Sequence, residues 1–221
     1  MSKYSKFFNF LTYKIIYFNF KYLPFNQAIK LPFFISRKVY LRNLKGKIKI
    51  ESPISIGMIK IGFGEVGIFD DKRSRSILDI NGNVIFKGSA NIGHGSKISV
   101  SENGTLTLGN NFTITAESSI VAHLNIEFGN DCLLSWETLI MDTDFHKIYN
   151  EFGELINDDQ PIKIGNNVWI GCRNLVLKGA VIPDNAVLGA NSVVSKKLDV
   201  ENAIYVGNPV RCVKENINWK L

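Results

Sequence analysis

Residues 164–196 read IGNNVWIGCRNLVLKGAVIPDNAVLGANSVVSK, and an aliphatic residue recurs at every sixth position of this stretch. The recurring residues are Ile164, Ile170, Val176, Ile182, Leu188 and Val194. The positions four residues after them are mostly small and are Val168, Asn174, Ala180, Ala186, Ser192 and Leu198. Glycine or polar residues fill most of the places between. A fixed period of this kind indicates a repeat architecture in which each repeat is one structural unit.

A period of six fits neither an α-helix, with about 3.6 residues per turn, nor the simple alternation of a half-buried strand. It does fit short strands that are separated by turns, because Gly, Asn and Asp tolerate the positive φ angles that tight turns need. Stacked coils of this kind share one apolar interior, with neighbouring strands about 4.8 Å apart. The same period occurs earlier with slips, at Ile80, Phe86, Ile92 and Ile98, at Leu108, Ile114 and Ile120, and at Phe128, Leu134 and Ile140. The predicted fold class is therefore all-β, as a parallel β-helix.

The repeat stops at residues 141–163, MDTDFHKIYNEFGELINDDQPIK, which are polar, acidic and long for a β-helix turn. Binding and catalytic residues concentrate on loops that a rigid scaffold holds in place. This loop contains Asp142, Asp144 and His146 in the order D-x-D-x-H. The spacing alone allows a catalytic imidazole that a carboxylate orients, or a surface histidine among acidic residues.

The charge of the chain is unevenly distributed. The 221 residues carry a formal net charge of +6, and residues 1–50 hold eleven Lys and Arg with no Asp or Glu. Aromatic residues are interleaved with these cations, and Phe7, Phe8, Leu11, Ile15 and Phe18 recur at helical spacing. Two compatible interpretations follow: an element that docks on the main domain, or a segment attracted to an anionic membrane surface. Nucleic-acid binding is less favoured because no recognised nucleic-acid motif accompanies the charge.

The cysteines and the hydropathy indicate where the protein works. The three cysteines form no C-x-x-C pair, which favours a reducing compartment over a disulfide framework. No run reaches the roughly 18 apolar residues that a membrane span needs, and no signal-peptide cleavage pattern follows the aromatic start. We expect a cytoplasmic protein, with peripheral contact at the inner face of the membrane as an open alternative.

The run from Ile164 to Lys214 resembles the C-terminal half of the hexapeptide-repeat acyltransferases. It contains the hexads, V-W-I-G around Trp169, V-V-S-K ending at Lys196 and G-N-P-V-R ending at Arg211, in that order. The resemblance is dense over residues 80–214 and looser over 46–79. The family includes the galactoside, maltose and xenobiotic acetyltransferases and acetyltransferases of surface-polysaccharide gene clusters. The resemblance implies a left-handed β-helix, a homotrimer and acyl-CoA sites in grooves between subunits.

The resemblance also implies roles for single residues. The family's catalytic histidine lies in a loop about two dozen residues before the V-W-I-G tryptophan, and His146 lies 23 residues before Trp169. His146 is therefore the expected general base, with Asp142 or Asp144 orienting it or holding the acceptor. The expected acetyl-CoA contacts are Trp169, Cys172, Ala190, Ser195, Lys196, Arg211 and Lys214.

The predicted function is acetyl-CoA-dependent O-acetylation of a sugar hydroxyl on a surface polysaccharide or its lipid-linked precursor, by direct transfer and without a metal. The alternatives are N-acetylation of a nucleotide-linked amino sugar and a trimeric β-helix scaffold without activity. A three-histidine zinc site of the γ-carbonic anhydrase type is disfavoured, because His94, His123 and His146 do not share a face of the predicted helix. The predicted organisation is a basic aromatic segment at 1–45, a β-helix at 46–214 and a tail at 215–221.

Overall fold

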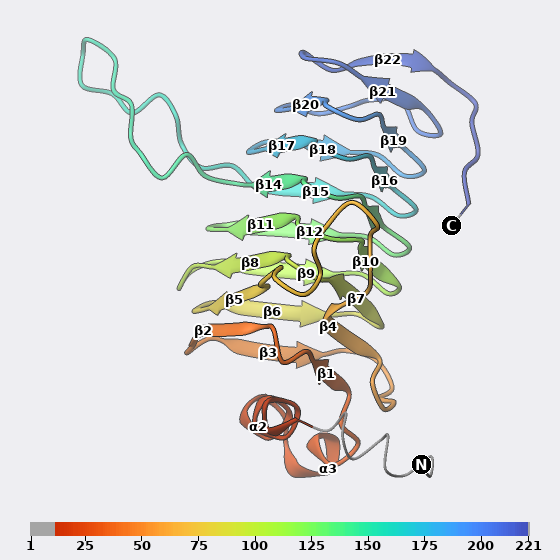
Figure 1. The fold of residues 1–221 in the computed structure, drawn as a ribbon. Helices are drawn as coiled ribbons and strands as arrows, with labels where there is room; N and C mark the ends of the chain where they lie inside the picture. The colour runs from red at the N-terminus through yellow and green to blue at the C-terminus, as the bar shows by residue number, and fades with distance from the viewer. Residues whose placement is uncertain (1–11, 221) are drawn as a thin grey trace.

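The computed structural model describes residues 12–220, and the chain winds in turn through three sheets whose strands are parallel except for the last pair, β21 and β22. Sheet A contains β1 (Phe33–Ile35), β4 (Ile59–Phe63), β7 (Ala90–Gly93), β10 (Phe112–Ile114), β13 (Leu133–Leu134), β16 (Trp169–Ile170), β19 (Val187–Leu188), β21 (Ile204–Val206) and β22 (Arg211–Lys214). Sheet B contains β2 (Tyr40–Leu44), β5 (Ile77–Ile80), β8 (Lys97–Val100), β11 (Ser119–Ala122), β14 (Leu139–Met141), β17 (Leu175–Leu177) and β20 (Val193–Val194). Sheet C contains β3 (Lys47–Ile50), β6 (Asn83–Phe86), β9 (Thr105–Leu108), β12 (Asn125–Phe128), β15 (Ile162–Ile164) and β18 (Val181–Ile182). The coils stack into one column (Figure 1), and the predicted left-handed parallel β-helix is confirmed.

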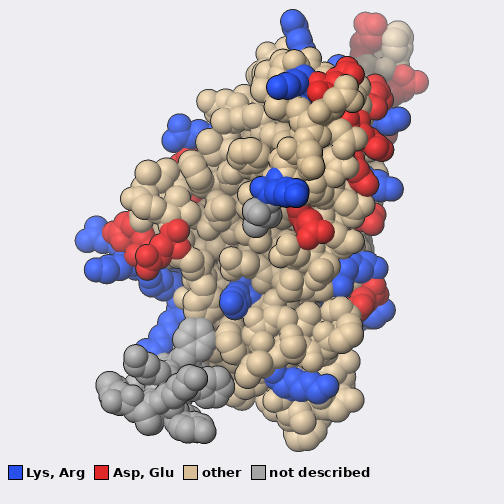
Figure 2. Space-filling view, turned by 90° about the vertical axis from the view of Figure 1, so that its right-hand side faces the viewer, with Lys and Arg blue, Asp and Glu red and all other residues tan. Residues whose placement is uncertain are grey.

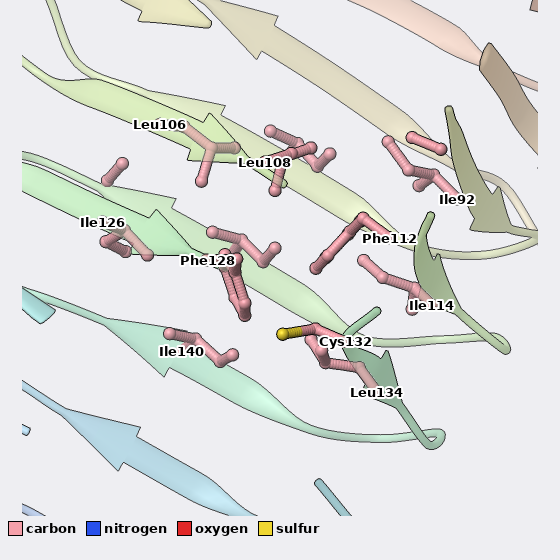
Figure 3. Packing of buried hydrophobic residues seen from close by; sticks show 14 of the residues in the cluster. Ile92, Leu106, Leu108, Phe112, Ile114, Ile126, Phe128, Cys132, Leu134 and Ile140 are labelled. Carbon is pink, nitrogen blue, oxygen red and sulfur yellow. The ribbon is translucent and has the colours of Figure 1, made fainter. Parts of the chain in front are cut away.

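The hexad residues form the interior of the column. Ile164 pairs with Ile182 in the next coil, and Val176 pairs with Val194 in the same way, so equivalent hexad positions lie directly above one another. All six residues of the hexad run are buried. Figure 3 shows the same stacking in earlier coils, where Ile92, Ile114 and Leu134 follow one another along sheet A. Burial raises the pKa of the Cys132 thiol in this core to about 12, which makes it an inert apolar residue.

Asparagine ladders hold the corners between strands. Asn167 and Asn185 occupy equivalent turns with φ angles of 51° and 58°, in the left-handed region that Asn tolerates better than most residues. The Asn167 side chain donates to the Asn185 side chain at 2.9 Å. The predicted turn chemistry is thus present, and it lets the short strands repeat without helical connections.

Two short helices cap the N-terminal end of the column: α2 (Tyr13–Tyr22) and α3 (Phe25–Ala28). The Phe18 ring meets the Phe33 ring of β1 with centroids 5.1 Å apart, and Ile15 is also buried. Buried Asn19 donates to the carbonyls of Ile15 and Phe33 and accepts from the Phe33 N–H, so all of these polar groups are satisfied. The described part of the N-terminal segment therefore docks on the β-helix, whereas Phe7, Phe8 and Leu11 lie outside the described residues.

The first coil begins with β1 and β2, so residues 33–45 already belong to the column, although the charge pattern groups them with the N-terminal segment. Two long connections interrupt the coils. Residues 142–161 replace the corner between sheets B and C and project from the column (Figure 1), and residues 64–76 replace a corner between sheets A and B. No helix within residues 12–220 is long and apolar enough to cross a membrane.

Candidate active site

The long connection at 142–161, here called the projecting loop, covers a hollow of about 440 Å³. The hollow lies where this loop meets the β11–β12 corner of the coil before it, and its lining includes His123, Phe145, His146 and Asp159. Two imidazoles and a carboxylate that lie far apart in the sequence thus share one polar concavity. The sequence pattern predicts only His146 among them.

The His123 ring has partners at both of its nitrogens. Nδ1 lies 3.0 Å from the Ser101 hydroxyl, one coil earlier at the same edge of the column. Nε2 lies 3.6 Å from a carboxylate oxygen of Asp159, which the projecting loop brings down to it. The Phe145 ring packs edge-on against the imidazole, with centroids 6.0 Å apart. These contacts fix the orientation of the His123 ring beside the hollow.

The His146 side chain is exposed at the hollow, and within residues 12–220 its imidazole makes no hydrogen bond. Its position comes instead from the backbone, since the Asn157 side chain donates to the His146 carbonyl at 2.8 Å. The Asn157 carboxamide oxygen also accepts from the Ile148 N–H at 2.6 Å. Asn157 therefore ties the two arms of the loop together and leaves the His146 ring free to meet a ligand.

Asp142 is fully buried and bonds to backbone groups. One carboxylate oxygen accepts from the His123 N–H at 2.7 Å, and the other accepts from the N–H groups of Leu124 and Asn125 at 2.9 and 2.7 Å. This carboxylate binds the start of the projecting loop to the corner that carries His123. None of its hydrogen bonds goes to the His146 ring.

Asp144 faces Lys178 in the next coil. Its carboxylate accepts from the Lys178 ammonium at 2.5 Å and from the Asn157 side chain at 2.9 Å. The hydrogen bonds from Lys178 and then Asn157 hold the pKa of Asp144 below its usual range. Lys178 also donates to the Asn157 carbonyl at 2.7 Å. The three residues anchor the loop base, and here too none of the carboxylate's hydrogen bonds goes to the imidazole of His146.

The predicted acetyl-CoA residues lie on two different edges of the column. Trp169 is 39% exposed on the outer face of sheet A, its Nε1 donates to the Ser135 hydroxyl at 3.1 Å, and its ring lies 5.9 Å from that of Trp219 in the C-terminal tail. Cys172 and Ala190 follow in equivalent corners between sheets A and B. The exposed strand β22, with Arg211 and Lys214, closes the same sheet as Trp169.

Ser195 and Lys196 lie elsewhere. They are exposed and follow β20 at the edge between sheets B and C, where the projecting loop also begins, two coils earlier. A single chain therefore places His146, Ser195 and Lys196 on one edge, and Trp169, Cys172 and Ala190 on or near another.

The remaining histidine is not part of the hollow. His94 lies at the β7–β8 corner, between sheets A and B, and is buried. Across residues 12–220 no group of three or more His, Cys, Asp or Glu side chains is arranged to hold a metal ion.

Comparison with known proteins supports this arrangement of hexads. The profile of the family described as "Bacterial transferase hexapeptide (six repeats)" matches residues 161–196.

Residues 161–196 therefore match the hexapeptide-repeat transferases.

The relatives of this chain include acetyltransferases. The galactoside O-acetyltransferase of Escherichia coli is 33% identical over 111 residues, which are 49% of this chain and 53% of the relative. The polysialic acid O-acetyltransferase of Neisseria meningitidis is 38% identical over 114 residues, which are 51% of each chain. The chain thus spans about half the length of these two relatives. The solved structure of a polysialic-acid-specific acetyltransferase, NeuO, has the same fold with a TM-score of 0.52 at 21% identity, covering 86% of this chain and 84% of that one.

Three residues that shape the hollow and the projecting loop are not singled out in the sequence analysis: Asn157, Asp159 and Lys178. His123, considered in the sequence analysis only as a zinc ligand, is brought to the hollow by the structure. In the sequence, only their polar character pointed to a role at the site. Their contacts join residues on neighbouring coils, and the sequence does not show which coils become neighbours. The interruption of the hexads was the one pattern that pointed to this edge.

Proposed function

We propose that the protein is an acetyl-CoA-dependent O-acetyltransferase that acts on a sugar hydroxyl of a surface polysaccharide or of its lipid-linked precursor. The observation that carries the proposal is the His146 imidazole, which has no hydrogen-bond partner among residues 12–220 and faces a polar hollow beside the oriented pair His123 and Asp159. Two related proteins are named as O-acetyltransferases of a galactoside and of polysialic acid, and these names support a sugar hydroxyl as acceptor.

A sugar hydroxyl attacks a thioester only when its proton is removed as the new bond forms, and His146 is the proposed general base. The acceptor oxygen forms a bond to the acetyl carbonyl carbon while the His146 ring takes the hydroxyl proton. The carbon–sulfur bond then breaks, and the imidazolium returns the proton to the departing thiolate of CoA. A backbone N–H of a neighbouring coil would stabilise the oxyanion between these steps. No acyl-enzyme is required.

His123 and Asp142 have supporting roles in this proposal. Asp159 and Ser101 hold the His123 ring at the far side of the hollow, where it can orient the acceptor by a hydrogen bond. Asp142 keeps the His123 corner and the projecting loop at a fixed separation. Asp144 acts through Lys178 on the loop base rather than on the imidazole.

Acetyl-CoA is proposed to bind in a groove between two protomers of a homotrimer. The exposed Trp169 and the small residues Cys172 and Ala190 suit the thin pantetheine arm, while Lys196, Arg211 and Lys214 offer cations for the phosphates of CoA. Because Trp169, Cys172 and Ala190 lie on or near a different edge of the column from His146, two copies brought side by side would complete a site that one copy does not.

The test is the rate of thiol release from acetyl-CoA in the presence of acceptor. His146→Ala is expected to lower kcat by at least about a hundredfold, as general-base catalysis contributes, with an unchanged melting temperature. His123→Ala is the matched variant, since it removes the second imidazole of the hollow and is expected to raise KM more than it lowers kcat. Near-normal kcat in His146→Ala would remove His146 from the chemistry.

The acceptor is identified with a panel of free sugars, nucleotide-linked amino sugars and extracted lipid-linked glycan. Turnover on the glycan or on sugar hydroxyls supports O-acetylation of a surface polysaccharide. Turnover confined to an amino-sugar nucleotide moves the assignment to N-acetylation. Failure to bind acetyl-CoA would favour the scaffold alternative.

A further inference from the structure

A second hollow, of about 240 Å³, lies at the N-terminal end of the column. It forms where α2, the β1–β2 turn and the end of the 64–76 connection meet. Six cationic residues line it: Lys14, Arg37, Lys38, Lys72, Arg73 and Arg75. We call it the basic hollow. Figure 2 shows Lys and Arg side chains gathered with a few carboxylates at the left edge of that view.

Two carboxylates of the described residues pair with cations of the basic hollow. Asp71 pairs with Lys38 at 3.0 Å, and Asp70 pairs with Arg73 at 3.6 Å. The Lys14 ammonium donates to the carbonyls of Arg37 and Val39 at 2.6 and 2.7 Å, and a carbonyl supplies no negative charge. Burial and then the nearby Arg75 lower the pKa of Lys14, as expected for an ammonium that is partly removed from water beside another cation.

A third hollow, of about 480 Å³, adjoins the basic hollow through Lys38, which lines both. His94 faces it and is 2% exposed, and within the described residues neither ring nitrogen has a hydrogen-bond partner. A buried imidazole without any partner is unfavourable, so a polar group from outside the chain is expected beside it. This unsatisfied imidazole lies at the third hollow, which Glu65 and Asp71 also line, and not at the basic hollow itself.

The helix that supplies Lys14 also presents an aromatic outer face. Tyr13, Ile16, Tyr17 and Phe20 recur at helical spacing on the side of α2 opposite the buried Ile15 and Phe18, and they are 44–78% exposed. Phe25 of α3 is 72% exposed, and its ring lies 6.0 Å from that of Phe20. Tyrosine and phenylalanine rings bury favourably at the boundary between lipid headgroups and acyl chains. A cation-lined hollow beside such a face has the chemistry of a lipid surface, which offers phosphate and hydrocarbon together.

We propose that the basic hollow binds the phosphate of an anionic membrane lipid while the aromatic face of α2 enters the interface of the bilayer. The N-terminal end of the column then faces the membrane, and the 72–75 segment, which lies outside the basic leader of the sequence, takes part in the contact. This inference deepens the proposed action on a lipid-linked acceptor. It rests on that proposed function only in naming a membrane lipid as the source of the bound phosphate.

The experiment measures binding of the full-length protein to sedimenting vesicles of phosphatidylcholine, alone or mixed with phosphatidic acid. The wild-type protein is expected to bind the vesicles that contain phosphatidic acid and not those of pure phosphatidylcholine. Lys72→Gln combined with Arg73→Gln is expected to weaken binding about thirtyfold, because each cation near an anionic surface contributes roughly a fivefold factor. The control is Lys45→Gln combined with Lys47→Gln, which removes the same charge from two exposed residues that do not line the hollow.

Near-wild-type binding of the control and loss in the Lys72 and Arg73 variant supports the site. Equal weakening in both variants would show general charge attraction and would overturn it. Titration with inorganic pyrophosphate, with no vesicles present, separates a lipid phosphate from a free one: binding to pyrophosphate without binding to vesicles would overturn the lipid source. Binding to RNA in preference to vesicles would do the same. No step of this assay involves acetyl transfer, so its failure and that of the proposed function are distinguishable.

Discussion

Three residues of the D-x-D-x-H stretch have different tasks although they are spaced by one residue. Asp142 is buried among backbone N–H groups, Asp144 is exposed and paired with Lys178, and His146 faces the hollow. A carboxylate that accepts three backbone hydrogen bonds in a buried position is a structural anchor, because no neutral side chain of the same shape can accept all three.

Asp142→Asn is expected to destabilise the protein by about 1–3 kcal/mol, since the amide group of Asn would face a buried N–H that then has no acceptor. Urea unfolding followed by circular dichroism measures the change. Asp144→Asn is the matched control at the exposed position and is expected to leave the midpoint nearly unchanged. Equal midpoints for wild type and Asp142→Asn would show that the three hydrogen bonds contribute little.

At the scale of the element, the projecting loop is held at its base by contacts with the coil beyond it. Lys178 bonds both the Asp144 carboxylate and the Asn157 carbonyl, and Asn157 bonds the other arm of the loop. A carboxylate whose pKa is lowered in the folded protein stabilises above its usual pKa, and the contribution disappears as the pH falls through the lowered value. The ion pair therefore holds the loop base at neutral pH and at mildly acidic pH.

Lys178→Gln removes the main cause of the lowered pKa of Asp144, which is expected to rise towards the usual value for Asp of about 3.9. Carbon-13 NMR titration of the Asp144 carboxyl measures this pKa in the wild type and in the variant. Backbone amides of 142–161 are expected to exchange faster with solvent in this variant at neutral pH, while Lys178→Arg keeps the charge and most of the protection. Unchanged exchange in Lys178→Gln would mean that the loop base does not depend on the ion pair.

At the scale of the whole molecule, the β-helix distributes the proposed site over separate edges. The projecting loop belongs to the edge between sheets B and C, whereas Ala190 lies at the corner between sheets A and B. A trimer would bring one edge of each copy to the other edge of its neighbour by a repeated heterologous contact.

This arrangement predicts complementation between two inactive proteins. His146→Ala and Ala190→Trp, denatured together and refolded as a mixture, are expected to recover activity in about a quarter of the sites, since each site would draw the loop and the groove from different copies. Each variant refolded alone is the control. Recovery that does not exceed the sum of the two controls would place both halves of the site in one chain.

The hexads determined the fold class, because each repeat is a local pattern: the aliphatic residue, the small residue and the turn all lie within six positions. Ile164, Ile170 and Val176 are all buried, and strands pair as the period requires. The break in the period likewise located the projecting loop and drew attention to His146. The assignment of His146 as base and the acetyl-CoA contacts remain predictions for the kinetic tests above.

The tertiary structure alone decided which polar residues meet. His123 with Ser101 and Asp159, Asp144 with Lys178, and the gathering of Lys14, Arg37 and Arg75 in the basic hollow all join positions that are separated by one or more coils or by the docking of α2. Stacking sets these neighbours through the lengths of intervening turns and loops, and polar residues in turns carry no period that reveals them. A repeated apolar pattern determines the column from sequence, whereas the contacts at its edges depend on where each coil comes to lie.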